Sequence, residues 1–313
     1  NRMLSFEMDT STGIIMNGEA VERAVTDAIN HPIGHVTSSL LNLWFKGKPA
    51  DNELLPNDIK PLFTLICNTE TSQYCHGRVL LASRVISFYR VDQSWTESNL
   101  IPLFDWGRSL AEAKAAWEGF LWSPRLYHPL LIALKPYFLE TASHYQTLGN
   151  HHQFAAFLTY AALSPIEGYT TGDFQTAFSN IPVEALNKSA QALTQVLEGA
   201  SGNQEEYWIN RILPFWQNVW PKSLNLVTQN VATPLARLSI AAGLEFPNAL
   251  AEVYDWLQPL KNPNYTITKL HKSGLCARFP ESAQLLLNII IDDQSSDAIN
   301  LQKCRQEIAN NLP

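Results

Sequence analysis

Two stretches near the C-terminal end, "EFPNALAEVYDWL" (residues 245–257) and "RFPESAQLLLNII" (residues 278–290), decide the fold. Each has Phe-Pro followed by apolar residues, and aligning Phe246 with Phe279 gives an offset of 33 residues. The aligned apolar positions are Leu250, Val253, Tyr254 and Leu257 in the first stretch and Ala283, Leu286, Leu287 and Ile290 in the second. This i, i+3, i+4, i+7 spacing predicts an α-helix with one apolar face in each stretch. Proline suits the first helical turn, where its missing N–H has no partner to lose.

A period near 33 residues is typical of helix-pair repeats, in which each unit buries its apolar face against its neighbours. We therefore predict that the two Phe-Pro helices occupy equivalent positions in successive units. Leu250, Val253, Leu286 and Leu287 should then face a common core.

Helix patterns continue along most of the chain. "GEAVERAVTDAIN" (residues 18–30) places Ala20, Val21, Ala24 and Val25 on one stripe, and His31-Pro32 should end that helix. Similar patterns occupy residues 35–45, 57–67, 77–89, 109–122, 128–145, 152–163, 183–199 and 205–220. Strand patterns are scarce, and only residues 3–16 could form a short hairpin. We predict an all-α fold, an α-solenoid-like array of helix pairs.

A boundary is expected at "FDWGRS" (residues 104–109), where an aromatic cluster gives way to Gly107 and a new helix start. This divides the chain into an N-terminal helical lobe, residues 1–106, and a C-terminal helical-repeat lobe, residues 107–313. We interpret the two as lobes of one solenoid. The chain opens "NRMLSF", without Met at position 1, which suggests a segment of a longer protein.

Composition excludes several classes of function. The formal net charge is -7, which argues against a nucleic-acid partner. No apolar run has the length of a membrane span, so no membrane partner is expected. The four cysteines show no disulfide-like spacing, which favours a reduced, cytoplasmic protein. Cys67, Cys75 and His76 lack a fourth zinc ligand at a suitable spacing, so no metal or other cofactor is predicted.

Three segments suggest a family: "WEGFLWSPRLYHPLLIALKP" (117–136), "HHQFAAFLTYAAL" (151–163), and "WLQPL" (256–260) followed by "LHKSGLCARFPESAQLLLNII" (270–290). Over most of residues 107–313 the chain resembles the C-terminal helical region of large bacterial sirtuin-like anti-phage defence proteins. The resemblance implies a non-catalytic scaffold or sensor that controls an NAD-consuming domain outside this chain. It implies a protein partner, either another copy or a phage protein. No catalytic residue of that family can be placed on this sequence.

The alternative is a stand-alone helical toroid enzyme that acts on carbohydrate, with tryptophans for sugar stacking and a carboxylate pair for acid and base catalysis. The candidate carboxylates are Asp92, Glu97, Asp105, Glu112, Glu118, Glu167 and Asp173. Solvated helix faces and helix caps explain such residues more simply. We therefore predict no catalytic residue.

One segment differs from the helical stripes. In "WSPRLYHP", Trp122, Arg125 and Tyr127 lie at a proline-bounded helix junction, and these residue types dominate interface hot spots. The alternative for these three residues is packing in the core. Core packing is also what we expect for the other helical tryptophans, at 117, 208, 216, 220 and 256. We predict that Trp122, Arg125 and Tyr127 contact a protein partner.

Overall fold

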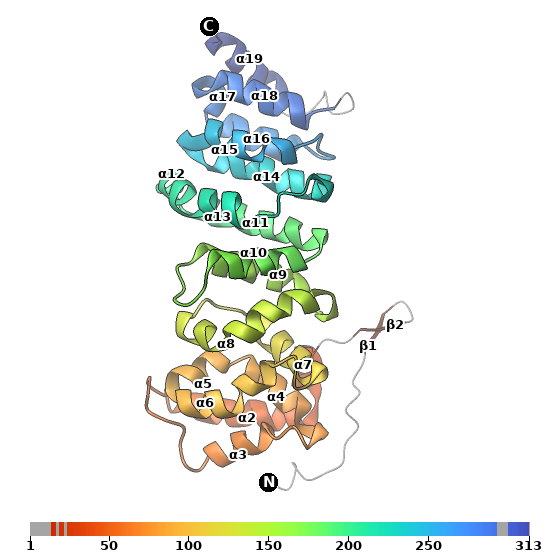
Figure 1. Cartoon of the computed structure of the whole chain (residues 1–313), viewed down its shortest axis with the longest axis vertical. Coiled ribbons are helices and arrows are strands. Elements are labelled where there is room, and N and C mark those ends of the chain that lie inside the picture. Colours follow the sequence, from red (N-terminus) through yellow and green to blue (C-terminus); the bar gives the residue numbers. More distant parts are fainter. Residues whose placement is uncertain (1–13, 17–18, 22–23, 293–299, 313) are drawn as a thin grey trace. The chain divides into compact units, whose positions relative to one another are not determined.

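The computed structural model describes residues 14–16, 19–21, 24–292 and 300–312, and nearly all of these belong to helices or the turns between them (Figure 1). The chain divides into two compact units. The first comprises the described residues up to Phe157 together with Ile166–Tyr169, and the second comprises Leu158–Pro165 and the described residues from Thr170 onward. The division therefore falls within helix α9 (His151–Leu163).

A short hairpin precedes the first helix. Strand β1 (Ile14–Met16) pairs antiparallel with β2 (Glu19–Val21), with Ile15 opposite Ala20. The prediction of helix from residue 18 was wrong at residues 19–21, because strand pairing with the β-branched residues of β1 occupies them. Of the expected hairpin at 3–16, only β1 lies within the described residues.

The first unit contains mostly short helices. They are α1 (Ala24–Asn30), α2 (Pro32–Lys46), α3 (Lys60–Ile66), η2 (Ser72–Tyr74), α4 (Cys75–Ala82), α5 (Val85–Val91), α6 (Gln93–Asn99), η3 (Ile101–Phe104), α7 (Leu110–Leu121), α8 (His128–Glu140) and η4 (Thr141–Thr147). The predicted stop at His31-Pro32 is confirmed, since His31 caps α2 by accepting the Ile33 N–H on its ring.

Helices α4 and α7 pack closely in this unit because of one glycine. A Cβ on Gly119 of α7 would lie 2.4 Å from the carbonyl oxygen of Val79 on α4, so only glycine allows this approach. The boundary expected at residues 104–109 lies inside this unit. The ring of Phe104, before it, packs edge-on against Trp117, after it, with centroids 4.9 Å apart.

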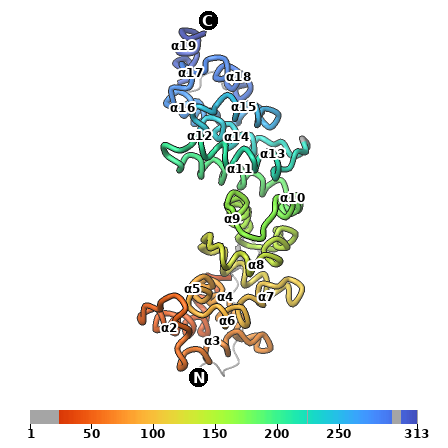
Figure 2. The backbone as a smooth tube through the Cα atoms, turned by 60° about the vertical axis from the view of Figure 1, so that its left-hand side comes forward, coloured from red at the N-terminus to blue at the C-terminus, as the bar shows by residue number. Residues whose placement is uncertain are grey.

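The second unit holds the remaining helices. They are the second half of α9, α10 (Thr171–Asn180), α11 (Val183–Gly199), α12 (Gln204–Tyr207), the π-helical η5 (Trp208–Ile212), α13 (Leu213–Asn218), η6 (Leu224–Leu226), α14 (Gln229–Ala241), η7 (Gly243–Glu245), α15 (Phe246–Val253), η8 (Tyr254–Trp256), α16 (Asn264–Lys272), α17 (Leu275–Arg278), α18 (Pro280–Ile290) and α19 (Leu301–Asn311). In both views α11, α14, α16 and α19 follow one another in that order within the unit (Figures 1 and 2).

The Phe-Pro pairs begin helices as predicted. α15 starts at Phe246 and α18 at Pro280, and the rings of Phe246 and Phe279 have centroids 6.5 Å apart. The predicted core residues are buried: Leu250, Val253, Leu286 and Leu287.

Tyr254 contradicts the predicted stripe, because it is 45% exposed. α15 ends at Val253 and continues as the 3₁₀ segment η8. A 3₁₀ turn has about three residues instead of 3.6, so the apolar stripe no longer lines up at this position.

Many long-range side-chain hydrogen bonds join residues separated by a similar length of chain. In the first unit Lys60 reaches Asp92, 32 residues on, and Trp106 reaches Thr141, 35 residues on. In the second unit Trp216 reaches the Glu252 carbonyl, 36 residues on. These hydrogen bonds tie segments some 30 to 40 residues apart in the chain to each other within each unit.

Candidate functional site

The turn between α7 and α8 carries the residues predicted to meet a partner. Trp122 is 51% exposed, and Arg125 and Leu126 are exposed beside it in sequence. Core packing therefore does not account for Trp122, whereas the tryptophans at 117, 208, 216, 220 and 256 are buried as expected. We call Trp122, Arg125, Leu126 and Tyr127 the α7–α8 rim. Leu126 was missed by the sequence argument, although it lies between two residues that were selected.

Tyr127 anchors the rim to the body of the unit. Its ring is half-buried and packs edge-on against Tyr89 of α5, with centroids 6.3 Å apart. Tyr89 in turn donates a 3.0 Å hydrogen bond to Glu97 of α6. Burial, followed by this carboxylate, raises the pKa of Tyr89 to about 12. One end of the rim is thus fixed, while Trp122 and Arg125 face solvent.

The same unit contains a polar groove of about 920 Å³. Helices α3 and α6 line it together with η3 and the start of α7, and its polar residues include Thr64, Asn68, Ser98, Asn99, Arg108 and Glu112. Two buried charged groups beside this groove, Asp92 and Arg78, hold its walls in place.

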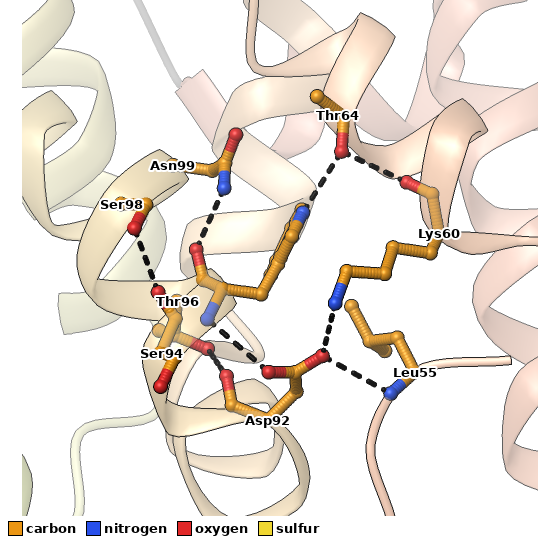
Figure 3. A network of polar contacts seen from close by, with 9 residues as sticks. Leu55, Lys60, Thr64, Asp92, Ser94, Thr96, Ser98 and Asn99 are labelled. Carbon is orange, nitrogen blue, oxygen red and sulfur yellow. Dashed lines mark hydrogen bonds and ion pairs between the residues drawn. The ribbon is translucent and has the colours of Figure 1, made fainter. Parts of the chain in front are cut away.

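Asp92 joins α3 to α6 (Figure 3). Its Oδ2 accepts hydrogen bonds from Lys60 Nζ at 2.8 Å and from the Leu55 N–H at 3.2 Å, and its Oδ1 accepts from the Trp95 N–H at 3.2 Å. Trp95 Nε1 donates across to Thr64 Oγ1 at 2.8 Å. Burial acts to raise the pKa of Asp92, but the hydrogen bonds from Lys60, Leu55 and Trp95 outweigh it and hold the pKa below its ordinary value. The carboxylate is therefore a structural anion.

Arg78 of α4 is the second buried charge, with a side chain only 1% exposed. Its Nε donates to Glu112 Oε2 at 2.7 Å, and Nη2 donates to the other oxygen of that carboxylate. Nη1 donates to the carbonyls of Asn68 and Thr71 at 2.9 and 3.1 Å. The bidentate pair connects α4 to the first turn of α7 and fixes one wall of the groove.

Cys67 lines the groove but is not arranged as a nucleophile. Burial raises the pKa of its thiol to about 12, more than the nearby Arg78 lowers it. At neutral pH the sulfur is a thiol, and the thiolate is the reactive form.

The carboxylates considered for sugar hydrolysis all have structural surroundings or lie at the surface. Asp92 and Glu112 are ion-paired, Glu97 accepts from Tyr89, Asp105 accepts from the Gly107 N–H and Glu118 from the Gly149 N–H. Asp173 completes a capping box with Thr170 at the start of α10, and Glu167 is exposed. Asp105 and Glu112 both line the groove.

Across the part of the chain that the structure describes, no three His, Cys, Asp or Glu side chains lie close enough together to hold a metal ion. His76 stacks on His31 with ring centroids 4.2 Å apart, and Cys67 is buried. Within the same described ranges, none of the helices combines the length and the apolar character needed to cross a bilayer.

Comparison of the chain with protein-family models, curated proteins and solved structures finds no match.

Proposed function

We propose that this chain is a non-catalytic helical-repeat scaffold that binds protein, and that it serves as the scaffold or sensor portion of a cytoplasmic bacterial anti-phage defence protein. In that role it controls an NAD-consuming sirtuin-like domain outside this chain. The resemblance of residues 107–313 to the helical region of those proteins suggests the biological setting.

The chain-length pattern of the tertiary hydrogen bonds supports the repeat arrangement. Glu118 accepts from the Gly149 N–H, 31 residues on, and Thr194 donates to the Pro234 carbonyl, 40 residues on. In a stack of helix pairs each pair contacts the next one in the chain, which gives bonds of this separation. Such stacks offer long surfaces made from successive turns and helix faces.

The α7–α8 rim is the observation that carries partner binding. A tryptophan that is 51% exposed, beside an exposed arginine and leucine, leaves apolar surface in water that a partner would cover. Because Tyr127 is held against Tyr89, one end of the rim is fixed before binding. Less ordering entropy is then lost on association.

The test has two parts. The isolated chain is incubated with NAD, and nicotinamide release is followed; we expect none, because the catalytic domain lies elsewhere. Separately, self-association is measured by sedimentation, and phage-infected and uninfected lysates are probed with wild-type chain and the W122A/R125A/Y127A variant. Association that appears in the wild type should weaken at least about tenfold in the variant, as expected for hot-spot residues.

Leu110→Ala is a matched control, because Leu110 is 63% exposed on the same unit but outside the rim. It should leave association unchanged. Nicotinamide release by the isolated chain contradicts the non-catalytic role. Equal association of wild type and triple variant contradicts the rim as the contact.

A further inference from the structure

The second unit contains two hollows lined mainly by α11, α14 and α16. A hollow of about 340 Å³ lies between α11 and α14, and one of about 660 Å³ is lined by α14 and α16. Arg237 of α14 lines both, so one side chain borders each hollow. We call the two hollows together the amide groove, after Asn187, Gln191 and Gln195 of α11 and Asn230 of α14.

The amides of α11 have a regular spacing. Asn187, Gln191 and Gln195 are each four residues apart, so they lie on one helix face with a rise of about 6 Å per step. An extended peptide repeats every two residues, about 6.7 Å. A primary amide has both a donor and an acceptor and can pair with the N–H and C=O of a peptide backbone. The row therefore matches an extended chain over two steps to within about 2 Å.

Some hydrogen-bonding groups of these side-chain amides remain for a ligand. Gln191 Nε2 donates to Asn187 Oδ1 at 3.0 Å, and Tyr160 donates to Gln195 Oε1 at 3.3 Å. These bonds orient the row. Lys188 Nζ also donates to Gln191 Oε1 at 3.4 Å, and none of the hydrogen bonds found within the described residues uses the Asn187 or Gln195 NH₂ groups or the amide of Asn230. Donors and an acceptor are thus available on both sides of the groove.

The far end of the groove is cationic. Arg237 Nη2 lies 3.3 Å from Glu198 Oε1, Lys269 Nζ lies 3.3 Å from the same oxygen, and the Arg237 guanidinium lies over the Tyr265 ring, 4.8 Å from its centroid. Lys272 also lines this hollow, as does the carboxylate of Glu205. Glu205 accepts the Leu244 N–H at 3.0 Å, and this hydrogen bond lowers its pKa. Three cations thus face two carboxylates, one of which is already held by backbone.

We propose that the amide groove binds an extended peptide segment, with its backbone on the amides of α11 and α14 and an acidic side chain at Arg237 and Lys269. The excess cation of the groove is complementary to one carboxylate, although the chain as a whole has a net charge of -7. This site lies in a different unit from the α7–α8 rim and does not depend on the rim's role.

The experiment uses the full chain immobilised on beads and three pools of amidated octapeptides. The first pool is randomised except for a Glu at position five, the second has Gln there, and the third is the Glu pool with N-methylated backbone amides. Retained peptide is quantified by mass spectrometry. We expect the Glu pool to be retained at least about fivefold more than the Gln pool, and the N-methylated pool to be lost to background, because it lacks backbone donors.

Two variants separate the parts of the site. Q191A/Q195A should lower retention of the Glu and Gln pools by the same factor, about fivefold. Arg237→Gln should remove the preference for Glu.

Gln284→Ala on α18 is the matched control for the amides, because its half-buried side chain also bonds an amide four residues away, Asn288, at 2.7 Å. It should change nothing. The proposal is overturned if wild type retains no pool above bare beads, if the N-methylated pool is retained equally, or if Q284A loses as much as Q191A/Q195A.

Discussion

Two arginine–carboxylate pairs of the first unit have similar distances but different surroundings. Arg78 and Glu112 have side chains 1% and 19% exposed, and the arginine also donates to backbone carbonyls. Arg90 and Asp51 are 50% and 52% exposed, with Nη2 and Oδ1 2.7 Å apart. In the buried pair, Arg78 left alone would be an uncompensated charge away from water, whereas Glu112 keeps some access to the groove. In the exposed pair, water and salt replace the lost partner. The burial of each ion pair, more than its geometry, therefore decides how much the pair contributes to folding stability.

The largest test applies the same comparison to neighbouring leucines of α18. Leu286 is fully buried and Leu285 is 41% exposed. Leu286→Asp places a carboxylate in the core, and we expect the free energy of unfolding to fall by about 4 kcal/mol or more. Leu285→Asp should cost less than about 1 kcal/mol. Urea unfolding followed by circular dichroism measures both, and equal losses would contradict the burial of this stripe.

Arg78→Met tests directly whether the buried pair contributes more to stability than the exposed pair. The change leaves Glu112 and the carbonyls of Asn68 and Thr71 without their guanidinium, so we expect a loss of about 3 to 5 kcal/mol in unfolding free energy. Arg90→Met is the matched control and should cost about 0 to 1 kcal/mol. A loss at Arg90 as large as that at Arg78 would show that exposure does not govern these pairs.

Asp92→Asn tests how the stabilisation by a buried carboxylate depends on pH. The pKa of Asp92 lies below its ordinary value in the folded chain, so its ionised form stabilises folding above the unfolded pKa of about 3.9, and this contribution is lost as pH falls through the folded pKa. At neutral pH the variant should lose about 1 to 3 kcal/mol. The difference between wild type and variant should shrink below about pH 4. Denaturant midpoints between neutral and acidic pH measure it, and a difference that stays constant into acid would contradict the ionised role.

Most helical segments could be predicted from the sequence because the pattern is local, but the single helix predicted at residues 77–89 is divided into α4 and α5. Leu250 and Leu286 are buried on the stripes that their spacing predicts, and Phe-Pro begins both helices. Proline and apolar periodicity act within a turn or two of the chain. Predictions failed where a local pattern met a competing local structure, as at β2 and at Tyr254 in η8.

The sequence selected the α7–α8 rim but left core packing open for Trp122. The exposed fraction of that side chain depends on what neighbouring helices cover, which residue types alone do not specify. The pairing of Arg78 with Glu112 was not predictable either, since the two residues lie 34 positions apart in the chain.

The all-α class, the Phe-Pro helix starts and most of the aromatic core follow from the sequence alone, because helix propensity and apolar spacing act over a few residues. Only the tertiary structure decided which charges are buried, which tryptophan is exposed, and that amides of α11 and α14 line one groove with Arg237. These features depend on side chains some 30 to 40 residues apart being brought together, as Glu198 and Arg237 are at a separation of 39. Such contacts form only when whole helices pack against each other. They therefore depend on burial and on the pairing of polar groups, which no local sequence pattern specifies.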